Sequence, residues 1–160
     1  MTPLTADLFV SLDGFALGID VGPYFGYAGP ELDSWVREHL EQPQVIVMGR
    51  VTYEEMAKLR RGRPTTRLLR GDLAEQVRAL KRQSADPLRS IGSLTLVRSL
   101  LHLGLVDRLR LTIFPLLLGD AGREPFYPGH PRSSLELIGT RVLDSRVVML
   151  EYRPAPGGAS

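Results

Sequence analysis

The chain has 160 residues, of which 43% are hydrophobic and 24% are charged, and its formal net charge is +2. This length and composition predict one domain over residues 1–153, with a proper core, and a disordered tail over residues 154–160. A balanced charge does not call for a nucleic-acid partner. The absence of cysteine excludes a disulfide framework and a thiolate metal site, and three histidines without ligand spacing predict no other metal site.

The sequence contains no signal for membrane insertion or secretion. No apolar stretch reaches the roughly 18 residues that a membrane-spanning helix needs, and the N-terminus lacks the basic segment of a secretory signal. We therefore expect a soluble, cytoplasmic protein without a membrane partner.

Apolar runs and helical patterns alternate through the first half of the chain. Residues 8–12 and 45–48 are predicted strands. Pro30 stands at a first helical position, and the apolar face of that helix contains Leu32, Trp35, Val36 and Leu40. Residues 66–70 could form a short strand, and Gly71 and Asp72 open a further helix.

The second half continues this alternation and then changes to strands alone. A strand at 88–91 leads into a helix that begins at Ser93 and ends at Gly104. Residues 109–118 form a long predicted strand, in which Pro115 indicates a bulge or an edge position. Residues 135–142 and 147–152 are typical of a terminal β-hairpin. This order predicts an α/β fold whose mainly parallel sheet is completed by an antiparallel hairpin.

The most informative segment is the turn at residues 48–55, which directly follows a predicted strand. Thr52 and Glu55 have the spacing of a capping box, so the helix is expected to begin at Thr52. Gly49 would allow close approach of a backbone or a ligand, and Arg50 adds a fixed positive charge to the positive end of the helix dipole. This chemistry suits a phosphate, although a well-capped turn without a ligand would show the same pattern.

A second turn of the same kind follows the strand at 88–91, where Gly92 and Ser93 precede a helical pattern. Ligands of open α/β sheets collect outside the carboxyl ends of the strands, so the two turns could hold the phosphates of a dinucleotide between them. Neither turn has the spacing of G-x-G-x-x-G or of a Walker loop, which excludes a Rossmann or P-loop assignment.

These segments together resemble a known family. The residues concerned are Ser11-Leu12-Asp13-Gly14-Phe15, the runs 47–54, 92–94 and 104–109, and Pro115-Leu116-Leu117-Leu118-Gly119. They are similar to the dihydrofolate-reductase-like proteins related to the C-terminal reductase domain of the riboflavin-biosynthesis deaminase-reductase. The resemblance covers nearly the whole chain and implies a three-layer fold, a reductase activity and NADPH as cofactor.

The resemblance also implies roles for particular residues. Arg50 would contact the 2′-phosphate, Thr52 would contact the pyrophosphate, and Gly49 would belong to the same cofactor-binding turn. Leu12 and Asp13 would border the nicotinamide. The helix start after the second strand would supply further phosphate contacts from Gly92, Ser93 and Leu94.

The proton donor is expected early in the helix that begins at Pro30, where dihydrofolate reductase has a carboxylate that binds the substrate ring. Asp33 is our preferred catalytic residue, and Glu31 and an ordered water are the alternatives. Acidic residues in a first helical turn are also expected from the helix dipole alone. Trp35 is expected in the core because it lies on the apolar helix face.

The chain departs from the family pattern in two places. Residues 58–64 replace a further strand and its turns, so either the fold lacks a strand on the adenine side or the sequence omits residues there. The substrate segment of riboflavin-pathway reductases and the Pro-Trp pair of dihydrofolate reductase are also missing. The substrate is therefore expected to be a small molecule, heterocyclic by similarity, without a specific identity.

Two functional hypotheses follow. The first is an NADPH-dependent reductase, with a riboflavin-type biosynthetic role by similarity, and the second is a dimeric nucleotide-binding or regulatory module that has lost turnover. A homodimer is expected in either case, because the long strand and the terminal hairpin carry more apolar surface than one sheet edge can hide.

Overall fold

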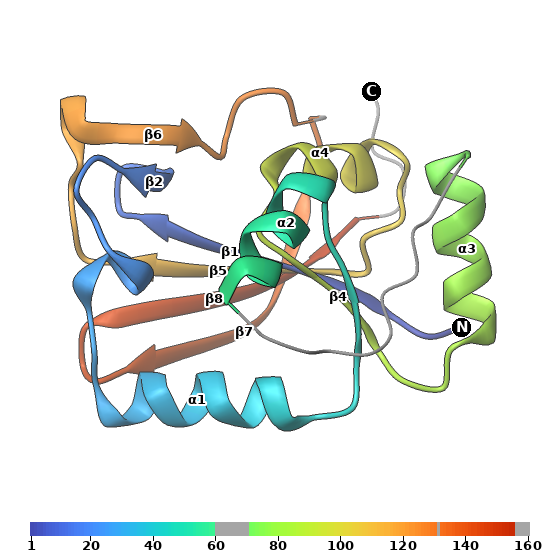
Figure 1. Ribbon diagram of the computed structural model, residues 1–160, viewed down its shortest axis with the longest axis horizontal. Coiled ribbons are helices and arrows are strands. Elements are labelled where there is room, and N and C mark those ends of the chain that lie inside the picture. The colour runs from blue at the N-terminus through green and yellow to red at the C-terminus, as the bar shows by residue number, and fades with distance from the viewer. Residues whose placement is uncertain (60–70, 131, 156–160) are drawn as a thin grey trace.

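The computed structural model describes residues 1–59, 71–130 and 132–155. Its centre is a six-stranded sheet with the strand order β3-β4-β1-β5-β8-β7 (Figure 1). The strands of this sheet are β1 (Leu4–Ser11), β3 (Val45–Val47), β4 (Leu88–Ile91), β5 (Arg108–Phe114), β7 (Leu135–Leu143) and β8 (Val147–Pro154). The helices are α1 (Pro30–Glu41), α2 (Arg50–Leu59), α3 (Leu73–Gln83) and α4 (Leu94–His102).

The strand directions confirm the predicted α/β architecture. β3, β4, β1 and β5 are parallel neighbours, whereas β8 is antiparallel to both β5 and β7. A second sheet, which the sequence did not predict, pairs β2 (Phe15–Gly18) with β6 (Gly122–Pro125). Two short 3₁₀ helices, η1 (Pro23–Gly26) and η2 (Gly119–Ala121), complete the described elements.

The two faces of the large sheet are covered by different helices. On one face α3 and α4 pack on a cluster of aliphatic side chains that includes Ala6, Leu8, Val77, Val97 and Leu100. On the other face α1 packs against β5 and the hairpin through Leu32, Trp35, Phe114, Leu143, Val147 and Met149. Figure 1 shows α1 in light blue beside the β7–β8 hairpin. This arrangement gives three layers and confirms the core position predicted for Trp35, whose side chain is 2% exposed.

The α1-facing side of the sheet contains a buried carboxylate. Asp7 on β1 forms ion pairs with Arg89 on β4 and with Arg110 on β5, whose Nη1 atom lies 3.2 Å from a carboxylate oxygen. The ring of Trp35 lies over both guanidinium groups, with centroid distances of 5.7 and 5.6 Å. These three charges are therefore paired with one another, and an aromatic ring covers the two guanidinium groups.

The structure corrects several predicted boundaries. β1 begins at Leu4 rather than at residue 8, and β5 ends at Phe114 rather than at residue 118, because Pro115 has no N–H for the sheet. α2 begins at Arg50 and not at Thr52, since the carbonyl of Gly49 already accepts the N–H of Tyr53 at 2.9 Å. The predicted strand at 66–70, most of the replaced segment at 58–64 and most of the tail lie outside the described residues.

The ends of α3 and α4 follow their sequence signals. The carboxylate of Asp72 accepts the N–H of Glu75 at the start of α3. Gly104, in the left-handed region at φ 64°, follows α4, and its N–H is donated to Leu101 while that of Leu105 is donated to Leu100. These two bonds form a Schellman motif, which explains why the glycine marks the end of the helix.

The start of α1 is capped from a distant part of the chain. The carboxylate of Asp144, in the β7–β8 turn, accepts the N–H groups of Glu31 and Leu32, both at 3.0 Å. The Glu31 carboxylate accepts the N–H of Asp144 in return. Gly29 makes this contact possible, because a Cβ at that position would lie 2.3 Å from the Asp144 carboxylate.

We predict that Asp144→Ala lowers the free energy of unfolding by about 1–2 kcal/mol, because two N–H groups at the start of α1 lose their acceptor. Asp144→Asn retains one side-chain oxygen and should lose less. Urea unfolding of the three proteins measures the difference. An alanine variant as stable as the original chain would contradict the role of this cap.

Candidate functional site

The site predicted from the two glycine turns lies at the carboxyl edge of the parallel strands. Ile91, the last residue of β4, pairs with Asp7, while β1 continues for four more residues to Ser11. That continuation extends about 13 Å beyond the shorter strand. The chain after β1 forms α1 on one face, and the chain after β4 forms α4 on the other. The crevice between β1 and β4 is thus a topological switch point, where open α/β sheets bind ligands.

The two glycine turns touch each other at this edge. A Cβ added to Gly49 would lie 2.7 Å from Oγ of Ser93, and one added to Gly92 would lie 3.7 Å from a methyl carbon of Thr52. Because Gly49 has no side chain, the two predicted turns can approach each other closely. The structure brings Gly49, Thr52, Gly92 and Ser93 together.

Both helices that start here direct their first N–H groups toward this edge. Ser93 is the N-cap of α4, with its side-chain oxygen 3.4 Å from the N–H of Leu96 and its backbone in the left-handed region at φ 52°. The remaining N–H groups in the first turns of α2 and α4 have no partner within their own helices. Two helix starts side by side form a site suited to an anion with more than one negative charge.

Two other predicted cofactor contacts, Arg50 and Leu94, differ in the groups that they can offer a ligand. The side chain of Arg50 is 80% exposed and forms an ion pair with Glu54, one helical turn away, at 3.8 Å. Such an exposed pair contributes little to stability and leaves the guanidinium able to bind a ligand. Leu94, by contrast, is 8% exposed and packs in the core, so it can offer only backbone groups.

The predicted nicotinamide contacts, Leu12 and Asp13, follow β1 directly. The side chain of Leu12 is 63% exposed. The carboxylate of Asp13 accepts the hydroxyl of Ser11 and the N–H groups of Leu118 and Gly119. These bonds favour the ionised carboxylate and hold the pKa of Asp13 below its usual value. The bond from Ser11 has the largest effect, and the bond from Gly119 has the next largest. Asp13 therefore fixes the loop after β1 against the segment after β5.

The predicted proton donors, Asp33 and Glu31, both lie in the first turn of α1. Asp33 is exposed, next to buried Leu32, which is the residue in this turn of α1 that faces the sheet. Glu31 is committed to the N–H of Asp144. The structure does not place either carboxylate with the two glycine turns, so the catalytic role of Asp33 stays a prediction.

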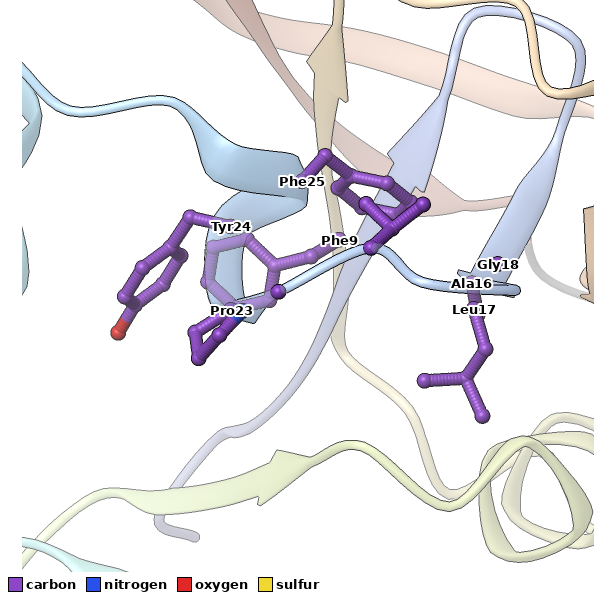
Figure 2. Close-up of a pocket in the computed structure, with 9 residues that line it drawn as sticks. Phe9, Ala16, Leu17, Gly18, Pro23, Tyr24 and Phe25 are labelled. Carbon is purple, nitrogen blue, oxygen red and sulfur yellow. The ribbon is translucent and has the colours of Figure 1, made fainter.

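A pocket of about 230 Å³ lies beside the last residues of β1 and was missed by the sequence analysis. Its wall comes from Phe9 on β1, from β2 and from the segment of η1. Figure 2 shows Phe9, Pro23 and Tyr24 gathered on one side of it. The clustering of Tyr24, Phe25 and Tyr27 in a glycine-rich loop was the available signal, since aromatic residues in such a loop need a surface to pack on.

No helix in the described ranges, 1–59, 71–130 and 132–155, has the length and apolar character needed to cross a membrane.

We predict that two substitutions at Ser93 differ in their effect on stability. Ser93→Ala removes the cap and keeps a Cβ in the left-handed region, so the free energy of unfolding should fall by about 1–2 kcal/mol. Ser93→Gly loses the same cap but relieves the backbone strain, so its stability should stay within about 0.5 kcal/mol of the original. Urea unfolding separates the two, and equal losses would show that this turn is not strained.

Comparisons with known proteins agree with this geometry. The family model of the RibD C-terminal domain matches residues 51–149, which are 99 of the 160 residues. The uncharacterized protein YyaP of Bacillus subtilis is 33% identical over 81 residues, which are 51% of this chain and 43% of the relative. The matched stretch thus spans less than half the length of that curated relative.

Solved structures show the same fold. A protein of Shewanella sp. PV-4 attributed to riboflavin biosynthesis has a TM-score of 0.70 at 18% identity, with 96% of this chain and 99% of that chain covered. RibD of Acinetobacter baumannii has a TM-score of 0.69 at 16% identity, with 97% and 58% covered.

Dihydrofolate reductase of Enterococcus faecalis, in complex with NADP(H), has a TM-score of 0.66 at 17% identity, with 95% of this chain and 96% of that chain covered. The dihydrofolate-reductase-like fold expected from the sequence is therefore confirmed. With the family model matching more than half of its residues, the chain belongs to the RibD C-terminal domain family.

Proposed function

We propose that this chain is an NADPH-dependent reductase that transfers a hydride to a small ring-shaped substrate. The observation that carries the proposal is the contact between the two glycine turns at the switch point of the sheet. The family assignment and the likeness to reductase structures, one of them in complex with NADP(H), support the same reading.

The residues present fit the phosphates of that cofactor. Gly49 allows the two turns to touch, because a Cβ at that position would collide with Ser93, and two helix starts meet at this contact. The pyrophosphate would accept N–H groups from these starts and the hydroxyl of Thr52. Arg50 would bind the 2′-phosphate, because its planar guanidinium forms paired, charge-assisted hydrogen bonds with phosphate oxygens.

The reaction asks mainly for positioning by the protein. NADPH, when bound, supplies the hydride. The substrate gains it on a carbon atom and gains a proton on the neighbouring atom. Since Glu31 is committed to Asp144 and Asp33 lies off the buried face of α1, an ordered water is the proton source that this arrangement favours.

The exposed position of Asp33 is also compatible with the second hypothesis, a nucleotide-binding module without turnover. Oxidation of NADPH by the purified chain, measured with pterins, ribitylaminopyrimidines and simple carbonyl compounds, distinguishes the two. Cofactor binding without oxidation of NADPH by any of these would favour the binding module.

We predict that Arg50→Ala weakens NADPH binding about tenfold or more and leaves NADH binding nearly unchanged, because only NADPH carries the 2′-phosphate. Calorimetric titration of both cofactors measures the preference. Arg37→Ala, which removes an exposed arginine from α1, is the matched control and should bind both cofactors as the original chain does. An unchanged preference in Arg50→Ala would place the phosphate contact elsewhere.

We also propose that the chain forms a homodimer through the β5, β8 and β7 part of the sheet face opposite α1, beside the part of that face on which α3 and α4 pack. Residues paired across strands have side chains on the same face, and on this face β7, β8 and β5 present Leu135, Leu137, Val142, Val148, Leu150, Tyr152 and Ile113. The exposed fractions of Leu137 and Val142 are 52% and 57%.

Along β7, polar and apolar side chains alternate in the opposite sense to that expected of a strand at a protein surface. The side of β7 toward α1 carries the charged residues Glu136 and Arg141 before buried Leu143, while the opposite side carries Leu135, Leu137 and Val142 together with Thr140. An interruption of register between Leu137 and Gly139 keeps Leu137 and Val142 on one face despite their different parity. An apolar face of three neighbouring strands is the kind of surface that a second copy covers.

We predict that Leu137→Glu converts the dimer into a monomer, because a carboxylate would be buried in the apolar contact. Sedimentation velocity at micromolar concentration should give about twice the chain mass of 17.7 kDa for the original protein and the single mass for the variant. Leu117→Glu replaces an exposed leucine outside this face and should leave the dimer intact. An original chain that sediments as a monomer would refute the proposal.

A further inference from the structure

We infer that the substrate which accepts the hydride is an uncharged ring, without a phosphate group, and that it enters the pocket beside Phe9. This inference rests on the proposed reductase function and specifies its substrate class. It starts from the position of the pocket. Phe9 lies on the part of β1 that extends past the end of β4, and the glycine turns lie at the ends of the neighbouring strands. A ligand held at those turns and a ring in the pocket would therefore share one edge of the sheet.

Among the residues that the structure describes, those that line the pocket carry no charged side chain. The lining residues are Phe9, Ala16, Leu17, Gly18, Val21, Gly22, Pro23, Tyr24 and Phe25. The whole segment 12–29, which supplies all of them except Phe9, contains Asp13 and Asp20 and no lysine, arginine or histidine. A phosphate dianion placed here would meet apolar groups and a net negative charge, both of which oppose its desolvation.

Within the described ranges, two arginines from other elements reach this segment, and both are engaged elsewhere. Arg123 lies opposite Leu17 in the register of the small sheet, but its guanidinium donates to the carbonyls of Asp120 and Gly122. Arg146 donates to the carbonyl of Ala28 and lies over the ring of Tyr27, at 5.2 Å from its centroid. Neither guanidinium is directed to the pocket as a phosphate ligand.

The aromatic side of the pocket is fixed in place. Tyr24 and Phe25 are both in the left-handed region, each with φ 53°, which is unfavourable for bulky residues and persists only where packing determines it. The rings pack on the sheet and on each other. The ring of Phe25 packs at a tilt of 40° against buried Phe114, with centroids 5.2 Å apart, and Tyr24 meets Phe9 edge to face at 5.7 Å. A prearranged aromatic surface binds a planar ring without the cost of ordering its side chains.

The size of the pocket limits the ring. A cavity of about 150 Å³ holds benzene in a protein interior, and this pocket measures about 230 Å³. It therefore has space for one or two fused rings with small substituents, whereas a phosphorylated ribose in addition to a ring would extend beyond it.

The experiment compares two probes that share a ring and differ in charge, 1-naphthol and 1-naphthyl phosphate. Calorimetric titration of the purified chain, with and without NADP⁺, measures the affinity for each probe. We expect 1-naphthol to bind at least tenfold more tightly. Tyr24→Leu should weaken its binding roughly threefold to tenfold, because the ring contact is lost. Tyr127→Leu, which removes an exposed tyrosine outside the pocket, should leave it unchanged.

A variant that adds a cation gives the converse test. Leu17 is 59% exposed, so Leu17→Arg should fold and should strengthen the binding of 1-naphthyl phosphate about tenfold through a charge-assisted bond. Equal or tighter binding of the phosphate by the original chain, or no binding of 1-naphthol, would overturn the inference. A chain that binds 1-naphthol with this preference but does not bind NADPH would refute the proposed reductase and leave the specificity of the pocket supported.

Discussion

The structure depends most on one buried carboxylate. Asp7, which is 1% exposed, joins β1 to Arg89 on β4 and to Arg110 on β5, and so links three parallel strands from the middle of the sheet. Taking charges out of water is unfavourable unless each is paired and hydrogen-bonded. Trp35 adds a further contact, because its ring covers both guanidinium groups and thereby fixes where α1 lies on the sheet. The position of α1 in turn determines where the hairpin turn can cap it.

The same strands determine where a ligand can bind. β4 ends beside Asp7, whereas β1 continues to Ser11, so the edge of the sheet has a step between a short strand and a long one. The glycine turns lie at the ends of the short strands, and Phe9 lies on the long one. An extended ligand fits such a step better than a compact one, because its charged and uncharged ends meet different surfaces.

Much of this arrangement could be predicted from the sequence, because the signals are local. Pro30, Asp72 and Gly104 mark helix ends within a few residues of themselves, and the alternation of apolar runs gives the order of strands and helices. The contact between Gly49 and Ser93 could be anticipated as well, since parallel neighbouring strands bring their carboxyl ends to one edge.

The remainder depends on contacts between distant residues. Asp144 caps α1 from 112 and 113 positions away, and no local pattern identifies that partner. Asp7 lay outside the predicted strand, so its ion pairs with two other strands were not considered. The assignment of a proton donor to Asp33 relied on the family pattern, which does not report the side of the helix that a residue occupies.

The interruption in β7 has a consequence for how the hairpin tolerates change. Ile138 is the unpaired extra residue between the two halves of β7. Its presence determines which face of the sheet the side chains of one half occupy relative to those of the other half. Its side chain is of secondary importance, whereas its presence is essential to the pattern. Deleting this one residue would exchange the two surfaces of half the strand, turning charges to where the leucines are now. A deletion or insertion at this position therefore moves a whole set of side chains to the other face at once, whereas most substitutions there leave the faces as they are.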